Sequence, residues 1–285
     1  MKIVVTGANG FIGKNLCVML REQGQHDVFE VYRETSEQVL LTYLSKADFI
    51  FHLAGINRPK DTSEFYKGNT DLTKFIVDSL SNFGRNVPIV LSSSIQVDQD
   101  NHYGKSKLAA EKAVKNYTKI TGSSSYIYRF PNVFGKWCKP NYNSFIATFC
   151  SNILNEIEIS VDNPSAKVTL VYIDDVCESM LGLLDGKSMT GLCKIPVEFD
   201  TTVGEVASII SSFKASRGTL ITESVGTGLV RALYSTYLSY VPPKDFSYSI
   251  PSYTDERGVF CEMLKTKDSG QFSFFTAHPG INRGG

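Results

Sequence analysis

Short apolar runs alternate with longer stretches in which apolar residues recur every three or four positions through the first half of this chain. The runs are typical of buried strands, and the longer stretches have the spacing of amphipathic helices. Strands are predicted at Lys2–Thr6, Val28–Tyr32, Phe49–Leu53, Val87–Leu91 and Ser125–Arg129, and helices at Thr70–Leu80 and Gly104–Tyr117. Because parallel strands need crossover connections, this alternation predicts an α/β fold, a doubly wound parallel sheet with helices on both faces.

From Pro131 onward the pattern is less regular, which favours a smaller lobe attached to the sheet domain. Helices are expected near Ser144–Leu154, Asp175–Leu184 and Val203–Lys214, a strand at Val168–Ile173, and a mobile loop in the turn-rich Gly218–Gly228. After Pro242-Pro243 the composition changes to aromatic, β-type segments at Val259–Lys265 and Gln271–Ala277. We therefore predict one domain over residues 1–243, its smaller lobe mainly within 131–243, and a β tail over 244–285.

The first predicted strand ends in a turn with three glycines, Gly7, Gly10 and Gly13, and a helical stretch follows at once. Such a strand–turn–helix unit places a helix N-terminus, with its free N–H groups and positive dipole end, against a dinucleotide pyrophosphate. Glycine is needed where the backbone approaches the phosphates and where the helix meets the strand. The sequence thus predicts a dinucleotide site formed by Gly7, Asn9, Gly10, Phe11, Ile12 and Gly13.

The charges balance, with 29 Lys and Arg against 29 Asp and Glu in 285 residues, so nothing indicates a nucleic-acid or membrane-surface partner. No apolar run reaches the ~18–20 residues that span a bilayer, and Met1 leads directly into the first strand. The six cysteines show no C-x-x-C pair, and several lie in apolar segments, which favours buried free thiols in a reducing compartment. We therefore expect a cytoplasmic protein.

The residue that follows the second strand bears on which dinucleotide is bound. An acidic side chain about 20 residues beyond the last glycine usually takes the ribose hydroxyls of NAD. Here that position is Arg33, whose guanidinium would pair with the 2′-phosphate of NADP, although Glu34 could serve NAD and Arg33 could be a solvated surface residue. The next strand closes on Leu53-Ala54-Gly55, where small residues let a cofactor lie over the carboxyl edge.

Tyr103 and Lys107 lie four residues apart at the start of a predicted helix, so both fall on one face. A free phenol has a pKa near ~10, and a neighbouring ammonium favours the phenolate, which would make Tyr103 a usable acid or base near neutral pH. The preceding strand delivers Ser92-Ser93-Ser94 to the same sheet edge, where a hydroxyl can hydrogen-bond a substrate carbonyl oxygen. Together with the glycine turn, these residues predict an oxidoreductase site.

These motifs resemble those of the extended short-chain dehydrogenase/reductases that act on nucleotide sugars, a Rossmann-fold family with a substrate-binding lobe. The matching segments follow the family order over residues 1 to about 180: Thr6–Gly13, His52–Gly55, Ser92–Ser94, Tyr103 to Lys107, Arg129–Gly135 and Val171–Val176. The resemblance implies that Tyr103 is the proton donor and acceptor, Lys107 its partner, and Ser94 the carbonyl-binding hydroxyl, with Ser93 as the alternative. It also implies that Asn132 contacts the diphosphate side of the sugar nucleotide, unless it only caps a strand end.

One departure from the family narrows the reaction. Its sugar-nucleotide 4,6-dehydratases carry Thr-Asp-Glu where this chain has Ser94-Ile95-Gln96, so the acid and base that eliminate water are missing. Dehydration is therefore not expected, whereas reduction and epimerisation remain.

Three further segments, Ser92–Gln96, Phe134–Ser144 and Leu233–Tyr240, resemble the bifunctional capsular polysaccharide enzymes of the UDP-N-acetyl-L-fucosamine pathway. Those enzymes join an NADPH-dependent C4 reductase to a C-terminal cupin that epimerises C3 and binds zinc. The resemblance implies a UDP-sugar substrate and, by analogy, a homodimer. Lys136 and Lys139 would close over the diphosphate unless their loop is merely solvated, and Arg217 is a further basic candidate for the substrate.

The β tail resembles the beginning of such a cupin. Asp255–Glu262 is similar to its opening strand, and His278–Gly285 to the segment before its metal motif. Four histidines without ligand spacing cannot build a zinc site, so we expect no metal, an incomplete cupin tail and no C3 epimerase activity. Because two or three β-segments cannot close a barrel, 244–285 is expected to be disordered, or paired with the body or another subunit.

Three functions stay open at this point. The first is NADPH-dependent reduction at C4 of a UDP-2-acetamido-2,6-dideoxy-hexos-4-ulose, with Tyr103 protonating the forming alkoxide. The second is an NAD-retaining C4 epimerase, which uses the same residues. The third is a dinucleotide-sensing binding protein, which would not require Tyr103 and Lys107, so the presence of both residues favours an enzyme.

Overall fold

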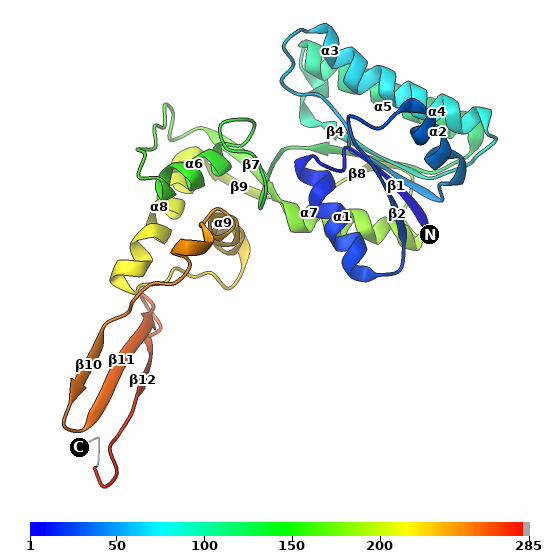
Figure 1. Ribbon diagram of the computed structural model, residues 1–285. Coiled ribbons are helices and arrows are strands. Elements are labelled where there is room, and N and C mark those ends of the chain that lie inside the picture. The colour runs from blue at the N-terminus through cyan, green and yellow to red at the C-terminus, as the bar shows by residue number, and fades with distance from the viewer. Residues whose placement is uncertain (282–285) are drawn as a thin grey trace. The chain divides into compact units, whose positions relative to one another are not determined.

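The computed structural model describes residues 1–281, and the chain divides into two compact units (Figure 1). The first unit holds Met1–Val133 and Leu170–Glu198, and the second holds Phe134–Thr169 and the chain from Phe199 onward. Residues 170–198, which the sequence pattern placed in the smaller lobe, therefore belong to the first unit. Positions 282–285, the end of the cupin-like segment, lie outside the described residues.

Six parallel strands form the sheet of the first unit, in the order β2-β1-β3-β4-β5-β8. Their bounds are β1 Lys2–Thr6, β2 Asp27–Val31, β3 Phe49–His52, β4 Ile89–Ser94, β5 Ser125–Phe130 and β8 Gly191–Cys193. The predicted doubly wound α/β fold is confirmed. The strand order reverses at β1, and sheets of this kind bind ligands outside the carboxyl ends of the strands at that point.

Helices cover both faces of this sheet: α1 lies beside α7 on one face, and α2, α4 and α5 cover the other (Figure 1). The helical elements of the unit are α1 Phe11–Gln23, α2 Glu37–Lys46, α3 Ser63–Phe65, the π-helical turn η1 Tyr66–Asp71, α4 Leu72–Asn82, the 3₁₀ turn η2 Ile95–Asp98, α5 His102–Thr121, α7 Ile173–Leu181 and η3 Gly182–Asp185. The return of 170–198 to this unit follows from two contacts, because α7 packs beside α1 and β8 extends the sheet next to β5.

An apolar core fills the space between the sheet and helices α2, α4 and α5. Ile76 and Leu80 of α4 and Val114 of α5 pack in one cluster with Val4 and Ile50 of the strands, and all five are 0% exposed. Full burial of such a side chain stabilises the fold by ~1.5–3 kcal/mol. This close-packed layer fixes α5 on the sheet.

Helix α5 begins and ends where its sequence carries capping signals. The side chain of Asn101 accepts a hydrogen bond from the N–H of Gly104 at 2.7 Å, and Gly122 ends the helix with φ +73°. The Asn side chain satisfies one of the N–H groups that a helix start leaves without a partner. Tyr103 is therefore held in the first turn of the helix and Lys107 in the second.

Three helices form the body of the second unit: α6 Phe145–Leu154, α8 Val203–Thr219 and α9 Gly228–Leu238. Phe213 of α8 packs against Tyr234 and Tyr237 of α9, with ring centroids 5.1 and 5.7 Å apart. A small sheet has the strand order β6-β7-β9, formed by β6 Asn132–Phe134, β7 Lys167–Tyr172 and β9 Phe199–Thr202.

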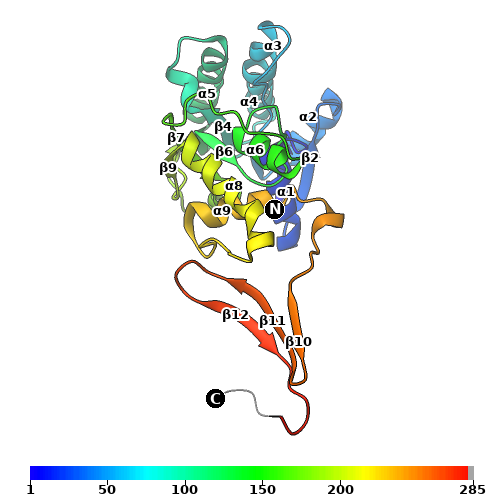
Figure 2. The ribbon, with the colours of Figure 1, turned by 90° about the vertical axis from the view of Figure 1, so that its left-hand side faces the viewer.

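A three-stranded antiparallel sheet follows the 3₁₀ turn η4 Pro243–Asp245 (Figure 2). Its strands are β10 Ser252–Asp255, β11 Gly258–Lys265 and β12 Gln271–Phe275. The N–H of Lys265 donates to the carbonyl oxygen of Leu220, and its carbonyl oxygen accepts from Thr222, both at 2.8 Å. Of the arrangements expected for the β tail, pairing with the body is the one observed. The same bonds hold part of Gly218–Gly228, which the sequence pattern presents as a mobile loop.

Candidate active site

The turn between β1 and α1 requires glycine at two positions. Gly7 has φ +69°, its N–H donates to the carbonyl oxygen of Val31 at 2.9 Å, and a Cβ on it would lie 2.7 Å from the nitrogen of Ala54. A Cβ on Gly13 would lie 2.2 Å from the carbonyl oxygen of Gly7, because α1 packs directly on the turn. Neither position has room for a side chain.

The N-terminus of α1 is open to an anion. Its N-cap residue, Gly10, makes no side-chain capping bond, and the first turn holds no acidic residue. Unsatisfied N–H groups and the positive end of the helix dipole attract phosphate at such a position. Asn9 is exposed beside it, and Phe11 and Ile12 are half-buried. The turn therefore fits the pyrophosphate of a dinucleotide.

A buried chain of hydrogen bonds joins the ends of β1 and β3 to helix α4. The N–H of Ala54 donates to Thr6 Oγ1 at 3.2 Å, and Thr6 Oγ1 lies 2.7 Å from Nδ1 of His52. His52 Nε2 lies 2.8 Å from Thr73 Oγ1, which itself donates to the carbonyl oxygen of Asn69 at 2.6 Å. Since the Thr73 proton is committed to Asn69, His52 carries its proton on Nε2 and accepts from Thr6 at Nδ1.

Burial, and then the charge of Lys107, lower the pKa of His52 to about 3. The imidazole is therefore neutral near pH 7, as the directions of its two hydrogen bonds require. The neutral His52 side chain thus fixes the end of β3. Leu53, Ala54 and Gly55, which are predicted to lie under the cofactor, follow directly after it. A Cβ on the exposed Gly55 would lie 2.8 Å from Nζ of Lys107, so the glycine leaves room for that ammonium.

Tyr103, Lys107 and Ser94, the predicted catalytic residues, meet at the carboxyl end of β4. The side chain of Ser94 lies near enough to the Tyr103 hydroxyl to lower its pKa. Lys107 Nζ lies 6.0 Å from the centre of the Tyr103 ring and donates to the carbonyl oxygen of Ser92 at 2.9 Å. Ser93, the alternative carbonyl-binding hydroxyl, instead donates to Glu111 at 2.7 Å. The geometry favours Ser94 as the hydroxyl that accompanies Tyr103.

The electrostatics of this group differ from the sequence expectation, in which Lys107 lowers the pKa of Tyr103. In the chain itself burial raises the pKa of Tyr103, and the side chain of Ser94 opposes that rise. Burial lowers the pKa of Lys107 to about 8, so the ammonium still predominates at pH 7. Tyr103 is thus a protonated phenol near neutral pH, tuned by Ser94.

Asn69 belongs to the site although no motif in the sequence pointed to it. It is 1% exposed and lies in the π-helical turn η1. Its amide nitrogen donates to Ser106 Oγ of α5 and to the carbonyl oxygen of Ile56, both at 2.9 Å, and its Oδ1 accepts from the N–H of Ile56 at 2.8 Å. It ties the segment after β3 to α5. The signal in the sequence that could have indicated Asn69 was the polar pair Asn69-Thr70, directly before an apolar helical stretch.

Arg33 is exposed and lies two residues beyond the end of β2. Glu30, the last acidic residue of that strand, is engaged by Arg21 and by the hydroxyl of Tyr32. Glu34, the alternative residue for ribose, is also exposed. The first turn of α2 begins three residues later, at Glu37, behind the N-cap Ser36.

The predicted substrate residues are divided between the two units. Asn132 is exposed at the start of β6, in the first unit. In the second unit Lys136 Nζ lies 5.6 Å from the Trp137 ring, and Lys139 Nζ lies 5.8 Å from the Tyr142 ring.

Arg217 is also in the second unit, but its guanidinium is engaged. It donates to the carbonyl oxygen of Asp245 and stacks 5.1 Å from the Tyr248 ring. These contacts tie the end of α8 to the segment around η4.

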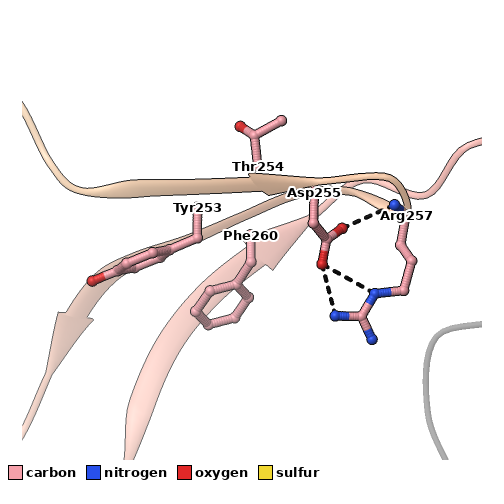
Figure 3. Close-up of a pocket in the computed structure, with 5 residues that line it drawn as sticks. All are labelled: Tyr253, Thr254, Asp255, Arg257 and Phe260. Atoms are coloured by element: carbon pink, nitrogen blue, oxygen red, sulfur yellow. Dashed lines mark hydrogen bonds and ion pairs between the residues drawn. The ribbon is translucent and has the colours of Figure 1, made fainter.

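A concavity of about 350 Å³ lies on the C-terminal sheet, apart from the residues discussed so far (Figure 3). Tyr253 and Phe260 line one side, and Asp255 holds Arg257 by a 2.7 Å ion pair on the other.

Within residues 1–281, no cluster of three or more His, Cys, Asp or Glu side chains could hold a metal ion. No helix in that part of the chain is long and apolar enough to cross a membrane.

Comparison with known proteins places these features in a family. Residues 3–190 match the NAD dependent epimerase/dehydratase family, and residues 253–285 match a polysaccharide biosynthesis C-terminal domain. The UDP-2-acetamido-2,6-beta-L-arabino-hexul-4-ose reductase of Pseudomonas aeruginosa is 50% identical over 286 residues, an alignment that covers all of this chain and 77% of the relative.

Solved structures agree with that assignment. The capsular polysaccharide assembling protein CapF from Staphylococcus aureus has a TM-score of 0.90 at 45% identity, covering 99% of this chain and 77% of that one. The UDP-glucuronic acid 4-epimerase of Bacillus cereus, in complex with NAD, has a TM-score of 0.72 at 19% identity, covering 84% and 98%. The second likeness shows a shared fold alone.

A parallel sheet with a glycine turn at its reversal point, and a tyrosine and lysine on the helix after β4, define a dinucleotide-dependent enzyme of the short-chain dehydrogenase/reductase type. The chain belongs to the NAD dependent epimerase/dehydratase family. The resemblance to nucleotide-sugar enzymes, and among them to those of capsular polysaccharide synthesis, is confirmed.

Proposed function

We propose that this protein is an NADPH-dependent reductase that acts at C4 of a UDP-2-acetamido-2,6-dideoxy-hexos-4-ulose, in UDP-N-acetyl-L-fucosamine and capsular polysaccharide biosynthesis. The observation that carries the proposal is the grouping of Tyr103, Lys107 and the end of β4 at the carboxyl edge of the sheet: Lys107 Nζ lies 6.0 Å from the centre of the Tyr103 ring and donates to the carbonyl oxygen of Ser92 at 2.9 Å. The relative from Pseudomonas aeruginosa, named as a reductase of a UDP-2-acetamido-2,6-beta-L-arabino-hexul-4-ose, supports the substrate class.

The two hydroxyls form a donor pair for the carbonyl oxygen of the sugar. NADPH, when bound, supplies the hydride that reduces C4. Tyr103 Oη gives its proton to the C4 oxygen as negative charge develops there, and Ser94 Oγ holds that oxygen by a hydrogen bond. The raised pKa of Tyr103 favours this direction of reaction, because a general acid must be protonated before it acts.

Lys107 has two roles in the proposal. Its ammonium is anchored on the carbonyl oxygen of Ser92 and would hydrogen-bond the nicotinamide ribose with its remaining protons. Its side chain also lies beside the Tyr103 ring, with Nζ 6.0 Å from the ring centre, and so helps to hold the phenol in place. Lys107 therefore contributes both to cofactor binding and to the position of Tyr103.

The preference for NADPH over NADH is assigned to Arg33. A guanidinium just beyond β2 is where a ribose 2′-phosphate would be recognised, through charge-assisted and bidentate hydrogen bonds. Glu30 does not compete for the ribose, because Arg21 and Tyr32 already engage its carboxylate.

In the second unit we propose Lys136 and Lys139 as contacts of the sugar nucleotide, with Arg217 as a weaker candidate; in the first unit we propose Asn132, taken by itself. Each lysine lies over an aromatic ring, and the two are three positions apart in one loop, so a short segment carries two positive charges. Such an arrangement suits a diphosphate. Arg217 is weaker because its guanidinium is already engaged by Asp245 and Tyr248.

The C-terminal sheet is proposed to begin a β domain of the cupin type, over residues 244–285. Tyr253, Phe272 and Phe275 are 63%, 60% and 61% exposed, a large amount of aromatic surface for three short strands. Exposed apolar surface of this kind marks an interface. We also propose that the protein is a homodimer, as expected from the resemblance.

The decisive assay supplies NADPH and a panel of UDP-4-keto sugars and identifies the products by NMR. Consumption of one NADPH for each C4 alcohol formed supports the reductase. Interconversion of two UDP-sugar C4 epimers without added NADPH would instead identify an NAD-retaining epimerase. Dinucleotide binding without turnover of any of these sugars would identify a sensing protein.

A further inference from the structure

A third member of the α5 face is buried beside the catalytic pair. Glu111 follows Tyr103 by eight residues and Lys107 by four, and it is 0% exposed. Its Oε1 accepts hydrogen bonds from Ser93 Oγ at 2.7 Å and from Arg129 Nε at 2.9 Å. Its Oε2 accepts from Arg129 Nη2 at 2.9 Å. One carboxylate therefore joins α5 to both β4 and β5.

The three residues of this face contact three consecutive serines. Lys107 bonds the Ser92 carbonyl oxygen and Glu111 bonds the Ser93 side chain, while Tyr103 lies near enough to the Ser94 side chain for it to lower the pKa of the phenol. Residues four apart on a helix lie on one side of it, so the helix meets the end of β4 at three successive turns. Displacing α5 along the strand would break all three contacts together.

The Glu111 contact is made by a charged group that several neighbours hold in place. Burial pushes the pKa of Glu111 upward, but the hydrogen bonds from Arg129 and Ser93 and the nearby positive charges bring it below its ordinary value. The group is thus an ionised carboxylate held by a two-pronged guanidinium. Arg129 is in turn 3.6 Å from Asp98 of η2, and Lys115 approaches Glu111 at 3.4 Å. Charge-assisted, bidentate bonds of this kind fix geometry as well as energy.

We propose that Glu111 is a positioning residue that sets the register of α5 on Ser92–Ser94, and thereby the placement of the Tyr103 proton relative to the substrate oxygen. The inference rests on the proposed function. It adds a residue that touches neither the substrate nor the cofactor and acts through Ser93 and Arg129. Small displacements of a proton donor lower the rate far more than they lower binding.

Two variants test the register and one serves as a control. Glu111→Gln keeps the size of the side chain and removes its charge, and Ser93→Ala removes only the β4 contact. Lys115→Gln is the control, because it alters the same neighbourhood from the half-exposed outer side of α5 and leaves the Ser93 and Arg129 bonds. Turnover is expressed per NADPH-binding site, so that a smaller folded fraction does not count as a lower rate.

We expect Glu111→Gln to lower kcat about tenfold or more and Ser93→Ala about threefold, with KM for the sugar within about twofold of wild type. The solvent deuterium isotope effect on kcat rises in both variants, because proton transfer becomes slower than the other steps. Lys115→Gln matches wild type. Wild-type kcat and isotope effect in Ser93→Ala and Glu111→Gln would overturn the proposal, as would losses confined to KM.

Hydrogen exchange measured without substrate separates this inference from the proposed function. In Glu111→Gln, or in Ser93→Ala if the former does not fold, amides in peptides covering 92–107 exchange faster while those of α1 keep their wild-type rates. Wild-type protein that reduces none of the sugars, with this exchange pattern present, refutes the reductase but upholds the positioning role. Uniform exchange across the unit, or none above wild type, overturns the positioning role.

Discussion

The side chain of Ser94 opposes the effect of burial on the pKa of the Tyr103 phenol. The partner that sequence spacing suggests for this task, Lys107, sits 6.0 Å from the ring centre and is anchored on the strand backbone. Ser94, and not Lys107, is therefore the side chain that lowers the pKa of the phenol. A protonated phenol near neutral pH suits a reductase.

Replacing Tyr103 by phenylalanine is predicted to lower turnover by ~10²-fold or more, since a general acid contributes 10²- to 10⁴-fold. Affinity for NADPH, measured by the change in its fluorescence on binding, should change little. Tyr43→Phe is the matched control, because Tyr43 is also half-buried and stacks on Phe29 at 4.8 Å, at the β2 edge of the sheet. Near-normal turnover in Tyr103→Phe would remove this residue from the mechanism.

Adding a methyl group at Gly13 should weaken dinucleotide binding and destabilise the first unit. The new Cβ would lie 2.2 Å from the carbonyl oxygen of Gly7, so α1 must move away from the turn. We expect NADPH affinity to fall at least about tenfold and Tm to fall by several degrees, as for overpacking of ~1–3 kcal/mol. Gly182→Ala is the control, since a Cβ there meets open space. Equal affinities in the two variants would contradict the assigned cofactor turn.

Arg33→Gln is predicted to change which dinucleotide is used. Loss of a charge-assisted contact with a 2′-phosphate, worth ~1.5–3 kcal/mol, should lower kcat/KM for NADPH at least about tenfold while leaving that for NADH unchanged. Lys46→Gln, at the far end of α2, removes a charge of the same sign and should leave the ratio alone. An unaltered ratio in Arg33→Gln would assign the 2′-phosphate to another residue.

His52 should make stability depend on pH. Its pKa is about 3 in the folded chain against 6.5 for an ordinary histidine, so the unfolded chain binds more protons between these values. The contribution to stability is fully present above about pH 6.5 and is lost as pH falls toward 3, by up to ~1.4 kcal/mol for each pH unit.

His52→Gln tests that dependence by urea unfolding followed by circular dichroism at pH 7 and pH 5. The variant is less stable at pH 7 by ~1–3 kcal/mol, because the chain of buried hydrogen bonds is broken. Between the two pH values wild type should lose ~2 kcal/mol more than the variant does. His278→Gln, at an exposed histidine, should behave as wild type. Parallel losses in His52→Gln and wild type would show that the imidazole is not held neutral.

The glycine turn and the Tyr103–Lys107 pair could be predicted because each is a local signal. Gly7 is needed for a positive φ, and residues four apart share a helix face in any context. The parallel sheet followed from alternation of strands and helices in the same way. Such features depend on a few neighbouring residues, and the structure contains them where the sequence indicated.

The roles of Asn69 and Glu111 could not be read from sequence, because each acts on residues far along the chain. Asn69 reaches Ser106 across 37 positions, and Glu111 reaches Ser93 and Arg129 across 18. Helix α2 was not predicted from the sequence, because only two of its residues, Leu40 and Leu44, are buried and the apolar pattern is therefore short. The second unit is discontinuous because β8 joins a sheet begun much earlier in the chain.

The most direct test of the account supplies NADPH deuterated at the transferred position together with a UDP-4-keto sugar, and locates the deuterium in the product by NMR. The account predicts one deuterium at C4 for each NADPH consumed, and transfer slowed ~10²-fold in Tyr103→Phe at full NADPH occupancy. A product without deuterium at C4, or undiminished transfer in that variant, would contradict it.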